Sequence, residues 1–135
     1  MKKILIPFFA FIALLMISSC EKDEGKLPNI NLKLTVGYIY GDTTMPAGTI
    51  FKIGINASKA EDKDVLKQFN VSESINGGAL TSIFDKTLSG SEGDNYSYDL
   101  QDTLGSVSGQ INKYTFTVTN RDGITNQVIV NVTIQ

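Results

Sequence analysis

The chain has 135 residues, with 12 Lys and Arg against 14 Asp and Glu, no His and one Cys. An acidic chain without a basic stripe is not expected to bind nucleic acid or to dock on anionic lipid by charge. Without His, and with one Cys, the usual zinc, copper and haem ligand sets and any Ser-His-Asp or Cys-His catalytic arrangement are not expected.

The first residues have the order of a signal peptide. A basic Lys dipeptide opens the chain, and residues 4–17 are almost wholly apolar. This apolar run is shorter than the roughly 20 residues that a membrane-spanning helix needs. Two small residues then precede Cys20. Because basic, apolar and small segments follow one another in this order, we expect residues 1–19 to be a signal peptide that is removed.

The residues around Cys20 resemble the lipobox of bacterial lipoproteins. The resemblance implies that the thiol of Cys20 carries a diacylglycerol and that Cys20 becomes the new N-terminus. A single acyl chain holds a protein only marginally on a membrane, whereas bacterial lipoproteins carry two or three chains, palmitate among them. Two alternatives remain, namely an ordinary signal peptide followed by an incidental Cys, and a retained N-terminal anchor helix.

An acidic stretch follows Cys20 and contains Lys22, Asp23 and Glu24. These three residues resemble the export signal of surface lipoproteins in Bacteroidota. The resemblance implies a lipid anchor in the outer membrane with the protein facing the cell exterior. The alternative is a solvated charged leader without an export role. Residues 20–30 are therefore expected to be a lipidated Cys and an acidic tether.

Residues 31–135 are expected to form one domain with one hydrophobic core, because a stretch of roughly 100 residues suits a single core. Alternating apolar residues predict a first strand over residues 32–40 and a second over residues 49–57. Ser58 and Glu61 have the spacing of a capping box, so either one helical turn or a charged loop is expected after the second strand.

Five further strands are expected in the rest of the chain. Residues 65–74 predict a strand in which Leu66 is out of phase with the other apolar residues, which indicates a bulge. The dipeptide Asn76-Gly77 predicts a hairpin turn that leads into residues 79–88, whose inward face the pattern does not define. The last three strands are expected at residues 95–100, 113–119 and 126–135. About seven short strands separated by turns predict an all-β, two-sheet sandwich.

The pattern of core positions resembles the bacterial Ig-like extracellular domains, which are similar to PKD and cadherin-like modules. The residues that carry the resemblance are 51–57, 66–71, 114–123 and 128–134. The resemblance covers most of the expected domain and implies an Ig-like β-sandwich of about seven antiparallel strands. The Cys pair and buried Trp of antibody domains are missing, which points to the disulfide-free branch. A shared fold does not by itself identify a function.

Asp94, Asp99 and Asp102 lie in or near expected loops. Calcium needs several oxygen ligands that converge, and cadherin-like modules bind it at loop ends, so these three residues are the calcium candidates. Turn-forming Asp in a solvated loop is the more frequent arrangement. No metal and no cofactor are therefore expected, with calcium at these three residues as the alternative. Nothing singles out two carboxylates for glycoside hydrolysis, so no enzyme is expected.

Two Tyr-x-Tyr pairs occur, Tyr38 with Tyr40 and Tyr96 with Tyr98. Both pairs are in phase with apolar residues, which predicts packing in the core; stacking on sugar rings is the alternative. The expected function is a non-catalytic, lipid-anchored cell-surface module. Its expected partners are the membrane, through the lipid on Cys20, and an unidentified glycan or envelope protein. The alternative is a structural spacer, or a subunit of an envelope assembly that pairs through an open sheet edge.

Overall fold

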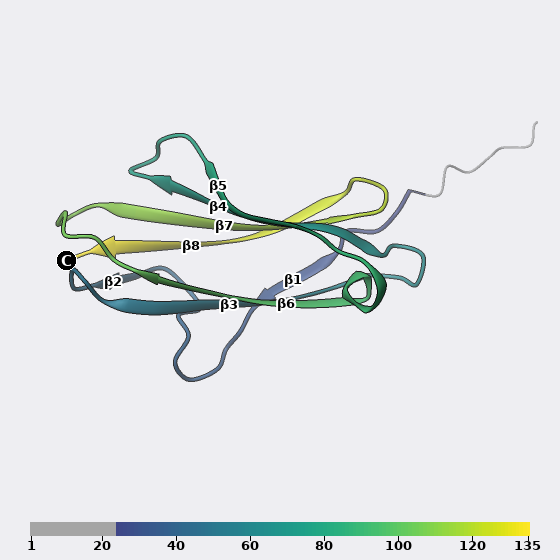
Figure 1. Cartoon of the computed structure of the whole chain (residues 1–135), viewed down its shortest axis with the longest axis horizontal. Coiled ribbons are helices and arrows are strands. Elements are labelled where there is room, and N and C mark those ends of the chain that lie inside the picture. The colour runs from purple at the N-terminus through teal and green to yellow at the C-terminus, as the bar shows by residue number, and fades with distance from the viewer. Residues whose placement is uncertain (1–23) are drawn as a thin grey trace, which may run out of the picture.

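Alternating apolar and polar residues along the chain build two β-sheets that pack face to face (Figure 1). The computed structural model describes residues 24–135. The expected signal peptide, Cys20, Lys22 and Asp23 lie outside the described residues. Within residues 24–135, no helix is long and apolar enough to span a membrane.

The described part of the chain contains eight strands and one short 3-10 helix. They are β1 (Asn29–Leu32), β2 (Thr43–Met45), β3 (Ile50–Ser58), β4 (Leu66–Ile75), β5 (Thr81–Thr87), η1 (Gly90–Gly93), β6 (Asn95–Thr103), β7 (Ile111–Asn120) and β8 (Thr125–Ile134). One sheet has the strand order β1-β3-β6, and the other has the order β2-β8-β7-β4-β5. The expected all-β, two-sheet sandwich is confirmed.

Neighbouring strands run antiparallel, with one exception: β2 and β8 are parallel. The expectation of uniformly antiparallel strands is wrong for this pair. The reason lies in the β1–β2 connection, which carries the chain from the three-stranded sheet to the five-stranded one. β2 therefore joins the edge of the second sheet beside the last strand, in the same direction.

An aromatic cluster around Phe69 fills the space between the sheets. Phe69 is fully buried, and its ring centroid lies 6.2 Å from that of Phe84, 5.1 Å from that of Tyr96 and 5.3 Å from that of Tyr98. Phe69 and Phe84 come from the five-stranded sheet, whereas the two Tyr residues come from β6 in the other sheet. The prediction that Tyr96 and Tyr98 pack on the core is therefore confirmed.

The structure confirms two features that the local sequence predicts, a bulge at Leu66 and a hairpin turn at Asn76 and Gly77. The pairing of β4 with β7 shifts register between Leu66 and Gln68, which confirms the expected bulge. Asn76 and Gly77 adopt φ angles of 50° and 73°, and two successive positive φ values are what a tight hairpin turn between twisted strands requires. Of the two alternatives after β3, the charged loop is the one that forms, over residues 59–64.

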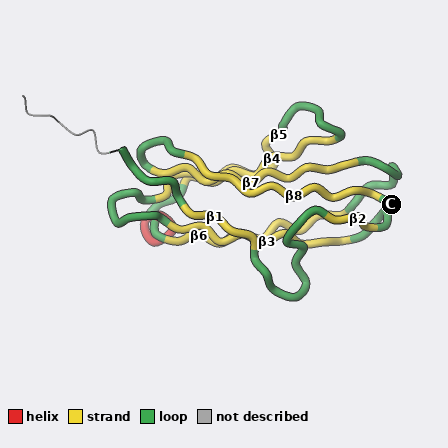
Figure 2. Tube along the Cα trace, turned by 180° about the vertical axis from the view of Figure 1, so that it is seen from behind, coloured by secondary structure: helices red, strands yellow, loops and turns green. Residues whose placement is uncertain are grey.

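The strand expected at residues 32–40 is wrong. β1 ends at Leu32, and the chain bulges outward as a loop that Figure 2 shows projecting from the sandwich between β1 and β2. The loop contains a turn in which Tyr38 N–H donates to the carbonyl of Thr35 at 3.1 Å, with Gly37 at a φ of 94°. Leu34 and Val36 consequently point into solvent, with 79% and 100% of their surface exposed.

The base of this loop is fixed over Gly54 in β3. The Nζ of Lys33 donates to Asp99 Oδ1 at 2.5 Å, and the Tyr38 hydroxyl donates to Asp99 Oδ2 at 2.9 Å. A Cβ at Gly54 would lie 2.5 Å from the Lys33 side chain and 2.8 Å from the Tyr38 ring. A side chain at Gly54 would therefore displace the Lys33 and Tyr38 side chains. Contacts with β3 and β6 determine the path of residues 33–38, although these residues alternate as in a strand.

Candidate functional site: a groove at one end and a clamped leader at the other

A shallow groove of about 740 Å³ lies on the β2–β8 edge of the five-stranded sheet. Its lining residues are Asp42, Thr43, Thr44, Ile111, Asn131 and Thr133. It adjoins a second hollow lined by residues 38–43, and the two share Asp42 and Thr43. The surface is mixed in character, with hydroxyl, amide and carboxylate groups beside an aliphatic and an aromatic side chain.

Asp42 and Asn131 form a fixed polar pair in this groove. The backbone N–H of Asn131 donates to Asp42 Oδ1 at 2.8 Å, and its side-chain amide donates to Oδ2 at 3.0 Å. These two hydrogen bonds lower the pKa of Asp42, so its carboxylate stays ionised at neutral pH. The carboxylate lone pairs that remain, and the Asn131 amide oxygen, are available as acceptors.

Tyr40 lies beside this pair and faces solvent. Its side chain is 62% exposed, and its hydroxyl makes no hydrogen bond within residues 24–135. Its neighbour Ile39 packs on the core and donates its N–H to the Lys52 carbonyl at 2.8 Å, so the backbone that carries Tyr40 is held in place. The prediction of core packing is therefore wrong for Tyr40, because the chain leaves β1 before reaching it.

Asp99 is occupied by the base of the β1–β2 loop. Burial acts to raise the pKa of Asp99, but the hydrogen bonds from Lys33 and Tyr38 outweigh burial and hold the pKa below its ordinary value. The carboxylate is therefore charged and fully engaged in fixing the loop.

The three calcium candidates do not converge. Asp94 forms an ion pair with Lys59 at 2.7 Å, and Asp102 accepts from the Tyr114 hydroxyl at 2.7 Å. Burial, followed by the hydrogen bond to Asp102, raises the pKa of Tyr114, so this hydroxyl remains a donor. No group of three or more acidic, His or Cys residues within the described chain could hold a metal ion. The three candidate residues therefore form no shared ligand set, because each is engaged by a different neighbour: Asp94 by Lys59, Asp99 by the base of the β1–β2 loop and Asp102 by Tyr114.

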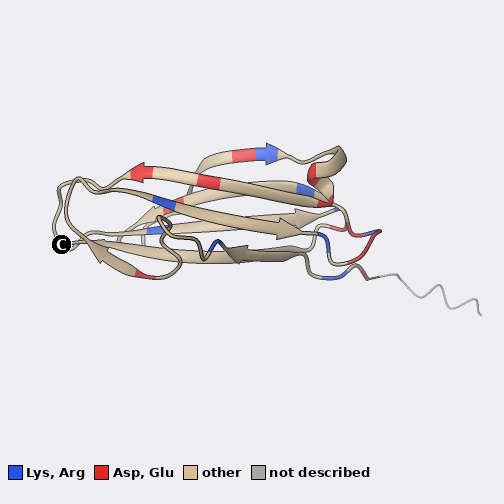
Figure 3. Cartoon of the chain, turned by 90° about the horizontal axis from the view of Figure 1, so that it is seen from below, with Lys and Arg blue, Asp and Glu red and all other residues tan. Residues whose placement is uncertain are grey.

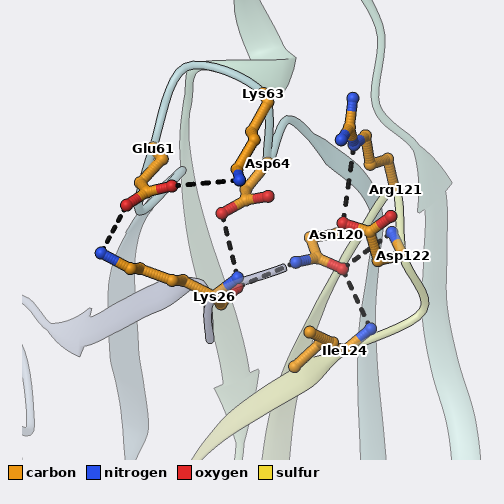
Figure 4. A network of polar contacts seen from close by, with 8 residues as sticks. All are labelled: Lys26, Glu61, Lys63, Asp64, Asn120, Arg121, Asp122 and Ile124. Atoms are coloured by element: carbon orange, nitrogen blue, oxygen red, sulfur yellow. Dashed lines mark hydrogen bonds and ion pairs between the residues drawn. The ribbon is translucent and has the colours of Figure 1, made fainter. Parts of the chain in front are cut away.

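The opposite end of the sandwich binds the described part of the leader, residues 25–28, which we call the strap (Figure 4). The Lys26 N–H donates to Asp64 Oδ2 at 3.0 Å, and the Asn120 amide donates to the Lys26 carbonyl at 2.9 Å. The Asn126 amide donates to the carbonyl of Pro28 at 2.9 Å. Residues 25–28 of the expected tether are thus bound to the sandwich, and its last two residues, Asn29 and Ile30, belong to β1.

Further polar contacts stiffen this end. Glu61 forms an ion pair with Lys26 and another with Lys63 at 3.6 Å. Asn120 Oδ1 accepts from the N–H groups of Asp122 and Ile124 at 3.0 and 2.9 Å, which closes the β7–β8 turn. Figure 3 shows several acidic and basic residues close together in the loops at this end, with other charged residues spread along the strands.

β7 links the two sites. Ile111 at its first position lines the groove, and Asn120 at its last position binds the strap. At about 3.4 Å per residue, these two residues lie roughly 30 Å apart. Groove and strap therefore occupy opposite ends of the molecule.

No protein-family model matches the sequence, and a comparison with curated proteins finds no match. Sequence reasoning missed both sites, because the contacts that build them join residues 89, 94 and 98 positions apart. The one local signal in the sequence is the Tyr-x-Tyr spacing of Tyr38 and Tyr40, and the structure shows that Tyr40 is exposed.

Proposed function

We propose that the protein is a lipid-anchored, surface-displayed module with an Ig-like sandwich that binds a saccharide in the groove beside Tyr40. The anchor is the lipid on Cys20, and Lys22, Asp23 and Glu24 direct the protein to the outer face of the outer membrane. The observation that carries the binding function is the exposed, unpartnered ring of Tyr40 next to the fixed pair of Asp42 and Asn131.

Strand arrangement supports the Ig-like part of the proposal. In Ig sandwiches the first, second, fourth and fifth strands of the seven-stranded form share one sheet, and the third, sixth and seventh share the other. β1, β3 and β6 lie in one sheet here, and β4, β7 and β8 lie in the other. β2 and β5 extend the second sheet at its two edges.

The chemistry of the groove supports a saccharide as the ligand. A pyranose ring has an apolar C–H face, which suits stacking on an aromatic ring, and a rim of hydroxyl groups that both donate and accept hydrogen bonds. Tyr40, in the adjoining hollow, offers the ring, and Ile111, in the groove, offers a separate apolar surface. Asp42, Asn131 and Thr133 offer acceptors and donors at the rim. Ligand sites commonly combine an apolar surface with a few placed polar groups in this way.

The same geometry supports binding without hydrolysis. Glycoside hydrolysis uses two carboxyl groups, one of which must be protonated to assist the leaving group. Asp42 is the single carboxylate among the lining residues of the groove, and the hydrogen bonds from Asn131 lower its pKa. A carboxylate that is ionised at neutral pH serves as an acceptor for sugar hydroxyls.

Replacing Tyr40 with Ala is expected to weaken saccharide binding roughly five- to tenfold, because a stacked ring contact contributes about 1 kcal/mol. The measurement is a glycan array probed with the mature lipoprotein in detergent, followed by titration of the best ligand. Val36→Ala is the matched control, since Val36 is an exposed apolar residue of the same loop that does not line the groove or the adjoining hollow. Unchanged affinity for Tyr40→Ala, or equal losses for both variants, would contradict the groove as the binding site.

A second candidate function is strand addition at the free edge of β6. This nine-residue strand pairs with β3 in an unbroken register and has no neighbouring strand on its other side among residues 24–135. The other long edge, β5, carries an irregularity in its pairing at Val71 and Ser72, a feature that discourages pairing with another chain. One co-purifying envelope protein, retained by the Tyr40→Ala variant, would favour this function over saccharide capture.

A further inference from the structure

We propose that the strap sets the orientation of the sandwich on the membrane, placing the loop end at residues 59–64 and 121–124 next to the lipid and the groove at the far end. This inference rests on the proposed lipid anchor at Cys20. In this orientation the loop end faces the membrane and the groove faces the ligand.

Buried polar groups on the sandwich hold the strap. Asp64 and Asn120 are 0% and 2% exposed, and both bind the backbone of Lys26. Asp64 Oδ1 has no hydrogen-bond partner within the described chain, so the Lys26 N–H is the side-chain hydrogen bond on which this buried carboxylate depends. A buried carboxylate without a partner is costly, and detachment of the strap is therefore unfavourable.

Close packing also fixes the path of the chain at Gly25. A Cβ at this position would overlap Asp122 Oδ2 and would lie 3.2 Å from Asp64 Oδ1. Pro28, at the other end of the strap, is buried. The strap is therefore held by backbone hydrogen bonds at Lys26 and Pro28. Gly25 has no side chain, which lets the backbone pack closely against Asp122.

The strap leaves residues 20–24 as the stretch of chain between the lipid and the sandwich. These residues span at most about 18 Å when fully extended. A leader that was free as far as β1 would span about 30 Å on the same basis. Since the groove lies roughly 30 Å from Asn120 along β7, the short connection keeps the strap end near the bilayer and leaves the groove accessible from outside.

Gly25→Val tests the strap without altering a residue of the sandwich. The wild-type Lys26–Leu27 bond is expected to resist trypsin, because both backbone groups of Lys26 are hydrogen-bonded. Gly25→Val should release the strap and speed cleavage at this bond at least tenfold, read as a fragment beginning at Leu27. Gly105→Val is the control, since a Cβ at Gly105 meets nothing within 4 Å. Rapid cleavage of the wild type at Lys26 would overturn the strap.

Energy transfer to a lipid-borne acceptor tests the orientation itself. Single Cys labels at Ser91 in η1 and Ser106 in the β6–β7 loop mark the two ends, and the acylated Cys20 cannot take the label. In vesicles, the lipoprotein should show higher transfer from Ser91 than from Ser106, and Gly25→Val should reduce the difference. Equal transfer in the wild type would overturn the inference.

The same preparation separates this inference from the proposed function. The mass of the N-terminal peptide reports whether Cys20 is acylated, and a saccharide titration reports whether the groove binds. An acylated, saccharide-binding protein with equal transfer from both ends overturns the orientation alone. A protein without acyl chains overturns the anchor.

Discussion

Replacing Cys20 with Ser is expected to move the protein completely from the membrane fraction to the soluble fraction. The thiol is the proposed attachment point of the diacylglycerol. Burial of an acyl chain contributes about 0.8 kcal/mol per CH₂, so two or three chains hold the protein firmly and their loss releases it. The measurement is fractionation of cells after a high-salt wash, combined with the mass of the N-terminal peptide.

Alanine substitution at Lys22, Asp23 and Glu24 is the matched control for this variant. It should leave the lipid and the membrane association unchanged, because the acylated residue is retained. A Cys20→Ser protein that still sediments with washed membranes would mean that another segment, such as a retained N-terminal helix, holds the protein on the membrane.

Replacing Phe69 with Ala is expected to lower the free energy of unfolding by about 3–5 kcal/mol. Phe69 is fully buried and contacts aromatic rings from both sheets, so its removal leaves a cavity where the sheets meet. The loss is large relative to the roughly 5–15 kcal/mol of stability that a folded domain has. The measurement is urea unfolding of the mature chain.

Ile129→Ala is the control for the core substitution. Ile129 lies on β8 and is partly exposed, so its replacement should change the unfolding free energy by no more than about 0.5 kcal/mol. A loss below about 1 kcal/mol for Phe69→Ala would contradict the burial of this ring between the two sheets.

Strands that are buried on one face could be predicted from the sequence. β7 and β8 alternate over most of their length, with Tyr114, Phe116 and Val118 buried on one strand and Val130 and Val132 on the other. Their period of two matches the pleat, so pattern and tertiary structure agree.

The segment 32–40 shows where the pattern fails. Its apolar residues alternate as in a strand, but Asp99, on β6, binds both Lys33 and Tyr38 and closes the loop over Gly54. These contacts are long-range, and they override the local β-propensity. Leu34 and Val36 are therefore exposed, although their spacing predicts burial.

The two sites could not be predicted, for a related reason. Asp42 and Asn131 are ordinary polar residues in the sequence, and their pairing follows from the parallel entry of β2 beside β8. Asp64 reads as one of several charged loop residues, yet it is fully buried against the strap. In both places the chemistry depends on topology, which local patterns do not encode.

We propose that the sandwich is displayed on the outer surface of the cell, anchored through Cys20, where a ligand can reach the groove. Proteinase K added to intact cells tests this location, with a periplasmic protein followed in the same samples. We expect the folded domain to be digested while the periplasmic protein remains whole. A domain that stays protected until the outer membrane is breached would contradict surface display.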